Sequence, residues 1–138
     1  MAVGGGEIVA TGAGLDTLSV MRFNDPVITV HVGDTVEWID EDSITAHTVT
    51  FGTEPQDPVP PSSNVTVDAD GACHAELNST SDSVHSGFLQ AAPQDRVGLP
   101  QASSGITRFR VTFSKPRIIR TSALCTTAFM KGKVAVLP

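Results

Sequence analysis

The feature that most constrains the fold is an alternation of apolar and polar residues on both sides of a Gly-Asp pair. Before the pair, Ile28 and Val30 alternate with polar residues, and after it Val36 and Trp38 do the same. A period of two is typical of half-buried β-strands, and no segment carries apolar residues at helical spacing over three turns. Gly33 makes positive φ inexpensive in the intervening turn. We therefore expect a hairpin here, in an all-β protein.

The same pattern continues through the rest of the chain. Further strands are predicted at residues 48–51, 65–67, 73–77, 106–113 and 133–137. Residues 54–63 and 79–105 are expected to be loops, because they are rich in Pro or in Ser and Gly and lack periodicity. Seven to nine short strands predict a Greek-key β-sandwich, formed as a single domain by residues 1–138. With one Trp, six Phe and no Tyr, the core is expected to rest on Val, Ile, Leu and Ala.

The charge balance excludes one class of partner. The formal net charge is −6, whereas phosphate backbones are bound through basic surfaces. Arg117, Arg120, Lys131 and Lys133 are spread over the C-terminal end and form no cluster in the sequence. Nucleic acid is therefore not expected as a partner. No apolar run has the length of a membrane span either.

Four His, two Cys and three Met are the only soft or borderline metal ligands in the chain. We interpret His31 as a surface residue on the polar face of a strand. His74, beside a turn, and His85, in the long loop, are interpreted in the same way. His47 differs, because it follows an acidic stretch and opens a strand, where a rigid sheet can orient its ring.

Cys125 and Met130 lie together in residues 114–131, which are expected to connect the last two strands. Thiolate, imidazole and thioether are the donors that suit copper cycling between its two oxidation states. By spacing alone, a Cys and a Met five residues apart are more often buried packing residues. The thiols of Cys73 and Cys125 are either free or joined in a disulfide, and their number does not decide between these states.

Five segments of the chain follow one another in a recognisable order. They are Ile28–Trp38, His47–Val49, Ser86–Leu89, Phe109–Pro116 and Met130–Val134. The order is a strand, a Gly-Asp turn, a strand ending in Trp, then His-Thr-Val, Ser-Gly-Phe, Phe-x-Val-Thr-Phe-x-x-Pro and Met-Lys-Gly-x-Val. In this order the segments resemble the plastocyanin and azurin-like blue-copper cupredoxins. The resemblance covers nearly the whole chain and implies a cupredoxin-like sandwich.

The resemblance also implies one type 1-like copper ion and electron transfer rather than enzymatic activity. It gives His47 the place of the first imidazole ligand and Met130 that of the weak axial ligand. The family's Cys-x-x-His, which carries the thiolate and the second imidazole, is missing between Pro116 and Met130. Ser122 stands at the thiolate position and Cys125 at that of the second histidine. We therefore expect an impaired copper site made of His47, Cys125 and Met130.

The altered segment can be read as the family motif in a neighbouring reading frame. One allowed choice of codons for residues 120–128, read from its third base, gives Tyr-Ile-Cys-Ala-Leu-His-Asp-Gly. We therefore hypothesise a local frameshift, in the gene or in its reading, that ends before Met130. Codons that cannot give this motif in another frame would contradict the hypothesis.

Two functions are consistent with such a chain. One is electron transfer with an unknown redox partner protein. The resemblance implies a monomer in the periplasm or outside the cell, whose export signal is absent from this sequence. The other function is that of a metal-free structural or binding module, because a domain of this length can bury a core without a metal. A multicopper enzyme is not expected, because four scattered histidines cannot supply several copper centres.

Overall fold

The computed structural model describes the backbone of residues 7–15, 18–20, 27–42, 46–57, 60–79, 81–90, 106–125 and 128–138. Side chains are described within these ranges except at residues 7–15, 18–20, 41–42, 123–125 and 128–130. All regular elements in the described part are β-strands, and no helix there is long and apolar enough to cross a membrane. The all-β class is confirmed.

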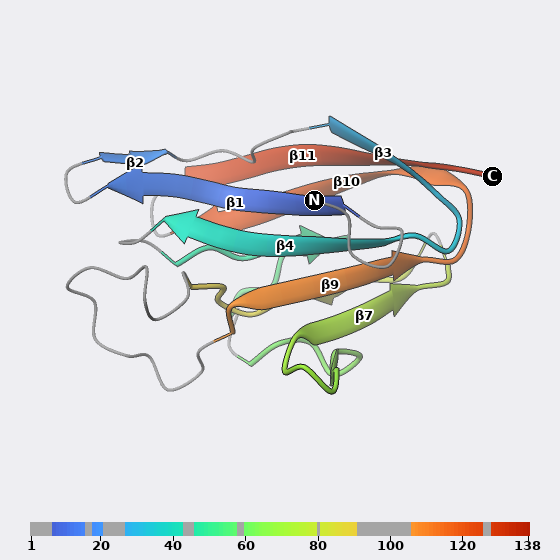
Figure 1. Ribbon diagram of the computed structural model, residues 1–138, viewed down its shortest axis with the longest axis horizontal. Helices are drawn as coiled ribbons and strands as arrows, with labels where there is room; N and C mark the ends of the chain where they lie inside the picture. Colours follow the sequence, from blue (N-terminus) through green and yellow to red (C-terminus); the bar gives the residue numbers. More distant parts are fainter. Residues whose placement is uncertain are drawn as a thin grey trace.

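The strands form two sheets, which pack as the two layers of a sandwich (Figure 1). The six-stranded sheet has the order β2 (Leu18–Val20), β1 (Glu7–Leu15), β4 (Thr35–Asp42), β9 (Arg108–Phe113), β7 (Cys73–Leu77) and β6 (Thr66–Val67). The five-stranded sheet has the order β3 (Val27–His31), β11 (Ala128–Leu137), β10 (Arg117–Cys125), β5 (Thr50–Phe51) and β8 (Val84–His85). The described residues form eleven strands, more than the predicted seven to nine. The additional elements are short, since β2, β5, β6 and β8 have only two or three residues each and carry little alternation in the sequence.

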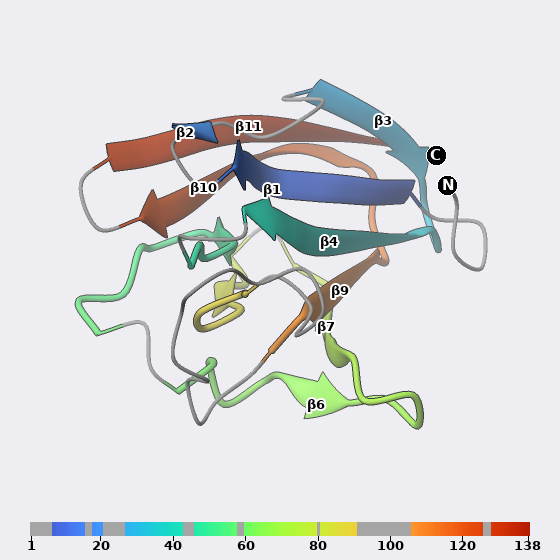
Figure 2. The ribbon, with the colours of Figure 1, turned by 60° about the vertical axis from the view of Figure 1, so that its left-hand side comes forward.

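The turn at Gly33 joins the two sheets rather than two strands of one hairpin. β3 pairs with β11, whereas β4 pairs with β1 and β9, so the predicted hairpin is wrong (Figure 2). The N–H of Asp34 donates to the carbonyl of His31 at 3.0 Å, and Gly33, the third residue of this turn, has φ 92°. Positive φ at the third position marks a type II turn, which splays the adjoining strands.

Two other expectations for the last part of the chain also need correction. Residues 114–131 do not form a connection, because β10 and β11 pair antiparallel from Arg117 opposite Val136 to Cys125 opposite Ala128. The β-branched residues of this segment favour extended backbone, and β10 pairs with β11 on one edge and with β5 on the other. The predicted loop 79–105 contains β8, whereas the predicted strands within 65–77 and 106–113 are confirmed.

The core rests mainly on Val, Ile, Leu and Ala, as expected from the composition, and an aromatic cluster lies within it. Trp38, Phe51, Phe109 and Phe113 are almost completely buried. The ring centroids of Trp38 and Phe51, which come from opposite sheets, lie 5.4 Å apart in an edge-to-face arrangement. Phe51 and Phe113 lie 5.8 Å apart. Trp38, Phe109 and Phe113 lie on the adjacent strands β4 and β9, and Phe51 lies on β5 of the facing sheet, so a few aromatic residues form one cluster. Aliphatic residues surround this cluster.

Candidate metal centre

His47 lies between β4 and β5 and is completely buried. Its N–H donates to the carbonyl of Leu89 at 3.0 Å, and the N–H of Leu89 donates to the carbonyl of His47 at 2.6 Å. The two bonds form an isolated bridge between His47 and the segment that follows β8. The backbone of His47 is thus fixed through both of its polar groups, which holds the imidazole inside the protein.

The residues after His47 alternate between two sides of the five-stranded sheet. The hydroxyls of Thr48 and Thr50 lie 3.5 and 3.0 Å from the same carboxylate oxygen of Glu54, so these two side chains share one side. Val49 and Phe51 belong to the hydrophobic core and occupy the other side. By this alternation His47 faces the core side and not the side of Glu54.

Ser122 lies on the side opposite to His47. β5 and β10 pair antiparallel, with Thr50 opposite Ser122 and Phe51 opposite Thr121. The hydroxyl of Ser122 donates to Oε2 of Glu54 at 2.5 Å. Thr121, by contrast, is buried. The thiolate position that the resemblance assigns to Ser122 therefore does not face His47 in this fold.

The structure describes Cys125 and Met130 by their backbone alone, and their side chains lie outside the described residues. Cys125 pairs with Ala128 at the end of β10, and Met130 pairs with Ala123. Alternate positions of a strand share one side, so positions 121, 123 and 125 fall on one side of β10. If the β5–β10 register continues three residues past its last pair, position 125 stands opposite His47.

His31 and His85 lie apart from the core side of His47. The side chain of His31, at the end of β3, is 66% exposed, as expected from the sequence. His85 is in β8 rather than in a loop, and it pairs with Thr50, which places it on the side of Glu54. Burial lowers the pKa of His85, and the negative charge of Glu54 partly opposes this shift.

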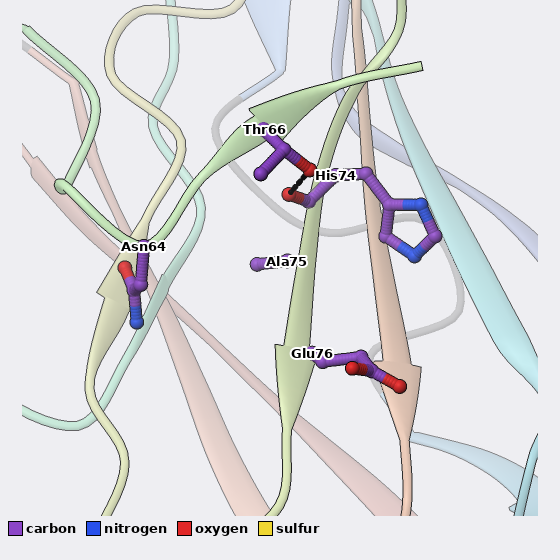
Figure 3. A pocket seen from close by; sticks show the side chains of 5 residues that line it. All are labelled: Asn64, Thr66, His74, Ala75 and Glu76. Carbon is purple, nitrogen blue, oxygen red and sulfur yellow. Dashed lines mark hydrogen bonds between the residues drawn. The ribbon is translucent and has the colours of Figure 1, made fainter.

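His74 is held on the outer side of the six-stranded sheet. Its Nδ1 lies 3.0 Å from both carboxylate oxygens of Asp68, and its Nε2 lies 2.8 Å from the hydroxyl of Thr112. Figure 3 shows the ring extending from β7 towards β9, beside a cavity of about 220 Å³ that Glu76 also lines. His74 is therefore a partly exposed surface residue, as expected, but both of its ring nitrogens have partners within the chain.

The comparisons with known proteins concern the fold. No model of a protein family matches the sequence, and no curated protein does. Among solved structures, the oxidised form of an amicyanin variant matches with 18% identity and a TM-score of 0.51, covering 97% of this chain and 84% of that chain. The Cu(I) form of another amicyanin variant gives the same values. A mutant plastocyanin of fern has 18% identity and a TM-score of 0.48, with 94% of this chain and 98% of that chain covered.

The chain has a cupredoxin-like fold. The expected fold is confirmed, but whether a metal binds depends on the side chains of this chain. Across the ranges whose side chains are described, no group of three or more His, Cys, Asp or Glu residues could hold a metal ion. A type 1 site with two imidazoles does not fit the cupredoxin-like chain, because His31, His74 and His85 all lie away from His47. Cys125 and Met130 belong to the side of β10 that carries Thr121, a placement compatible with a site that has one imidazole.

Cys73 of the cupredoxin-like chain is a free, buried thiol in β7. The bridge to Cys125 that the sequence left open is therefore not formed. Burial raises the pKa of the Cys73 thiol, and the negative charge of Asp68 raises it further. A thiol with a raised pKa is a poor metal ligand, because the thiolate is the form that binds.

Proposed function

We propose that this chain binds one copper ion through the imidazole of His47, the thiolate of Cys125 and the thioether of Met130. The observation that supports the proposal is the β5–β10 register, which would bring position 125 opposite the buried His47 if it continued three residues beyond Ser122 and Thr50. Residues directly opposite in an antiparallel pair lie about 5 Å apart at Cα, which allows both side chains to reach one metal. Met130 pairs with position 123, on the same side of β10.

This donor set favours Cu(I) over Cu(II). Thiolate and thioether are soft ligands that select Cu(I), and imidazole suits both oxidation states. Copper would supply one-electron chemistry, whereas the residues of the chain would fix the donors and exclude water. With one imidazole instead of two, the oxidised ion is left short of a ligand. The role we propose is therefore electron transfer with an impaired site, and no substrate is transformed.

The cellular setting of this function follows from the resemblance in sequence to exported copper proteins. We propose that the chain acts as a monomer in the periplasm or outside the cell. Its partner would be a redox protein that exchanges one electron with the copper. The frameshift hypothesis concerns the gene and stays a hypothesis.

The experiment is a titration of the purified apo-protein with Cu(II), followed by optical spectroscopy, and with Cu(I) under anaerobic conditions against a chromophoric chelator. We expect one equivalent of Cu(I) to bind tightly and Cu(II) to bind more weakly. An intense blue thiolate-to-copper band at one equivalent of Cu(II) would show that Cys125 is recruited and that the site keeps its redox function.

Two serine variants provide the matched control. Cys125→Ser should abolish stoichiometric Cu(I) binding, because it removes the thiolate that we assign to the site. Cys73→Ser should leave binding unchanged, because Cys73 belongs to the other sheet. Absence of one-to-one binding of either ion by the unaltered protein would support the alternative, a metal-free structural or binding module.

A further inference from the structure

The fold gathers three cations that are scattered in the sequence. In the β10–β11 pair, Arg120 stands directly opposite Lys133, and Ser122 stands opposite Lys131. Arg120, Lys131 and Lys133 are all exposed. Because directly opposite residues share one side of a sheet, the three cations lie on the side of Ser122, away from the core. Like charges directly opposite each other destabilise a sheet, so this arrangement works against folding.

No described residue neutralises these cations. Arg120, Lys131 and Lys133 form no hydrogen bond or ion pair with any part of the chain that the structure describes. Other arginines behave differently. Arg108 and Arg110 are paired with carboxylates, and Arg117 donates to the carbonyl of Ser79. Among the described residues the three cations thus have no partner, although the net charge of the chain is −6.

The carboxylate of Glu54, on the same side of the sheet, is hydrogen-bonded to hydroxyl groups and not to the three cations. Glu54 accepts hydrogen bonds from the hydroxyls of Thr50 and Ser122 and forms no ion pair with Arg120 or Lys131 among the described residues. Among the described side chains its single negative charge leaves an excess of two positive charges on this part of the surface. The excess is available to an anionic group from outside the chain.

The surface around the cations is hollowed and partly apolar. A cavity of about 190 Å³ is lined by Gly52, Arg120, Thr121, Ser122, Lys131 and Gly132. Ile118, two residues before Arg120 on β10, is 72% exposed, and Val27, paired with Lys133, is 62% exposed. Cations beside exposed aliphatic side chains and a small hollow can contact a partner that offers both acidic and apolar groups.

We propose that the outer side of β10 and β11 docks a protein partner through an acidic and apolar surface of that partner. A carboxylate of the partner enters the cavity between Arg120 and Lys131, a second lies near Lys133, and apolar side chains cover Ile118 and Val27. Complementary charge speeds the encounter and fixes orientation, while apolar contact supplies the buried area. This surface is formed by strands that need no copper, so the inference is independent of the proposed metal function.

The test uses the metal-free full chain and a synthetic peptide of alternating Glu and Leu, with binding followed by amide NMR shifts. We expect saturable shifts confined to β10, β11 and β3, which weaken as salt is added. Charge reversal by Arg120→Glu or Lys133→Glu should weaken binding about fivefold or more. Lys115→Glu changes the net charge equally, outside this surface, and should leave binding nearly unchanged.

Urea unfolding of the same variants shows whether a loss of binding is caused by a loss of folding. Arg120→Glu places opposite charges face to face with Lys133, so it should be at least as stable as the unaltered chain in urea while losing the peptide. Equal weakening by Lys115→Glu would overturn the proposal, because binding would then depend on net charge alone. Absence of shifts, or tighter binding to vesicles of phosphatidylserine than to the peptide, would overturn it as well.

Discussion

The hydroxyl of Ser122 donates a 2.5 Å hydrogen bond to the carboxylate of Glu54. The same carboxylate accepts from Thr50, which is paired with Ser122 across β5 and β10. The two strands thereby turn their polar side chains towards the loop that carries Glu54. His47 faces the opposite, core side, so the copper motif of the family cannot be restored by changing Ser122 alone.

A substitution at Ser122 tests this orientation directly. We expect Ser122→Cys, made together with Cys125→Ser, to give no intense blue band with Cu(II), because the new thiolate points towards Glu54. The measurement is the optical spectrum at one equivalent of Cu(II). A strong charge-transfer band in the double variant would show that position 122 reaches His47 and would contradict the register. The single variant Cys125→Ser is the control.

Arg110 is expected to be the most important charged residue for stability on the outer side of the six-stranded sheet. Its Nε lies 2.7 Å from Oε2 of Glu37, and the two side chains are only 13% and 6% exposed. Replacing Arg110 by Met leaves the carboxylate of Glu37 buried without its cation, which should cost about 3 kcal/mol in the free energy of unfolding. Arg108→Met should cost much less, because that pair is more exposed. Urea unfolding of both variants measures the difference, and equal losses would contradict it.

Stability should fall in acid because of the carboxylates of the β6–β7 turn. Hydrogen bonds from Arg110 hold the pKa of Asp70 well below its ordinary value of 3.8. Partial burial acts to raise the pKa of Asp68, but hydrogen bonds from His74 and Arg110 outweigh it, and this pKa is lowered too. Depressed pKa values in the folded state stabilise the protein above the ordinary value, and this stabilisation is lost as pH falls through the folded-state values.

Unfolding in urea at a series of pH values from about 6 down to 2 would measure this loss. The unaltered chain should become steadily less stable below about pH 4. Asp70→Asn should show a shallower decline, because one of the two groups no longer titrates. The same slope in both proteins would mean that Asp70 does not contribute to the acid sensitivity.

Gly52 should tolerate substitution less well than Gly71. Both have positive φ, 91° and 86°, which costs a residue with a side chain about 1 kcal/mol. A Cβ at Gly52 would lie 2.7 Å from Oγ of Ser83, whereas a Cβ at Gly71 would meet no atom within 4 Å. Gly52→Ala should therefore lose about 2 kcal/mol or more of unfolding free energy, and Gly71→Ala about half of that. Comparable losses in urea unfolding would show that the contact with Ser83 relaxes.

Local pattern was sufficient for much of the fold. The alternation around Phe109 predicted β9, and the Asp70-Gly71 pair predicted the turn between β6 and β7. Such signals act within a few residues, because burial on one side of a strand and positive φ in a turn are decided locally. The ordered match to the cupredoxin pattern anticipated the sandwich that the comparison of structures then showed.

Pairing between distant strands was decided by the tertiary structure alone. Val27–His31 and Thr35–Asp42 have the alternation of a hairpin, yet they belong to different sheets, because β11 and β9 offer each a partner that is remote in the sequence. β10 was mistaken for a connection for the same reason. A strand is stabilised by the strands that pair with it, and a partner about seventy residues away in the sequence does not change the local pattern of apolar residues.

For the candidate site, too, the sequence determined the residue types and the tertiary structure determined their positions. The sequence by itself determined which donors exist, one His-Thr-Val histidine, one Cys and one Met near the chain's end, and that no second histidine accompanies them. Only the tertiary structure decided that Ser122 turns towards Glu54, that Cys73 stays a free thiol in the other sheet, and that three separate cations share one surface. Residue types are fixed by the chain, whereas the side of a sheet on which each lies depends on a register set by partners far away in sequence.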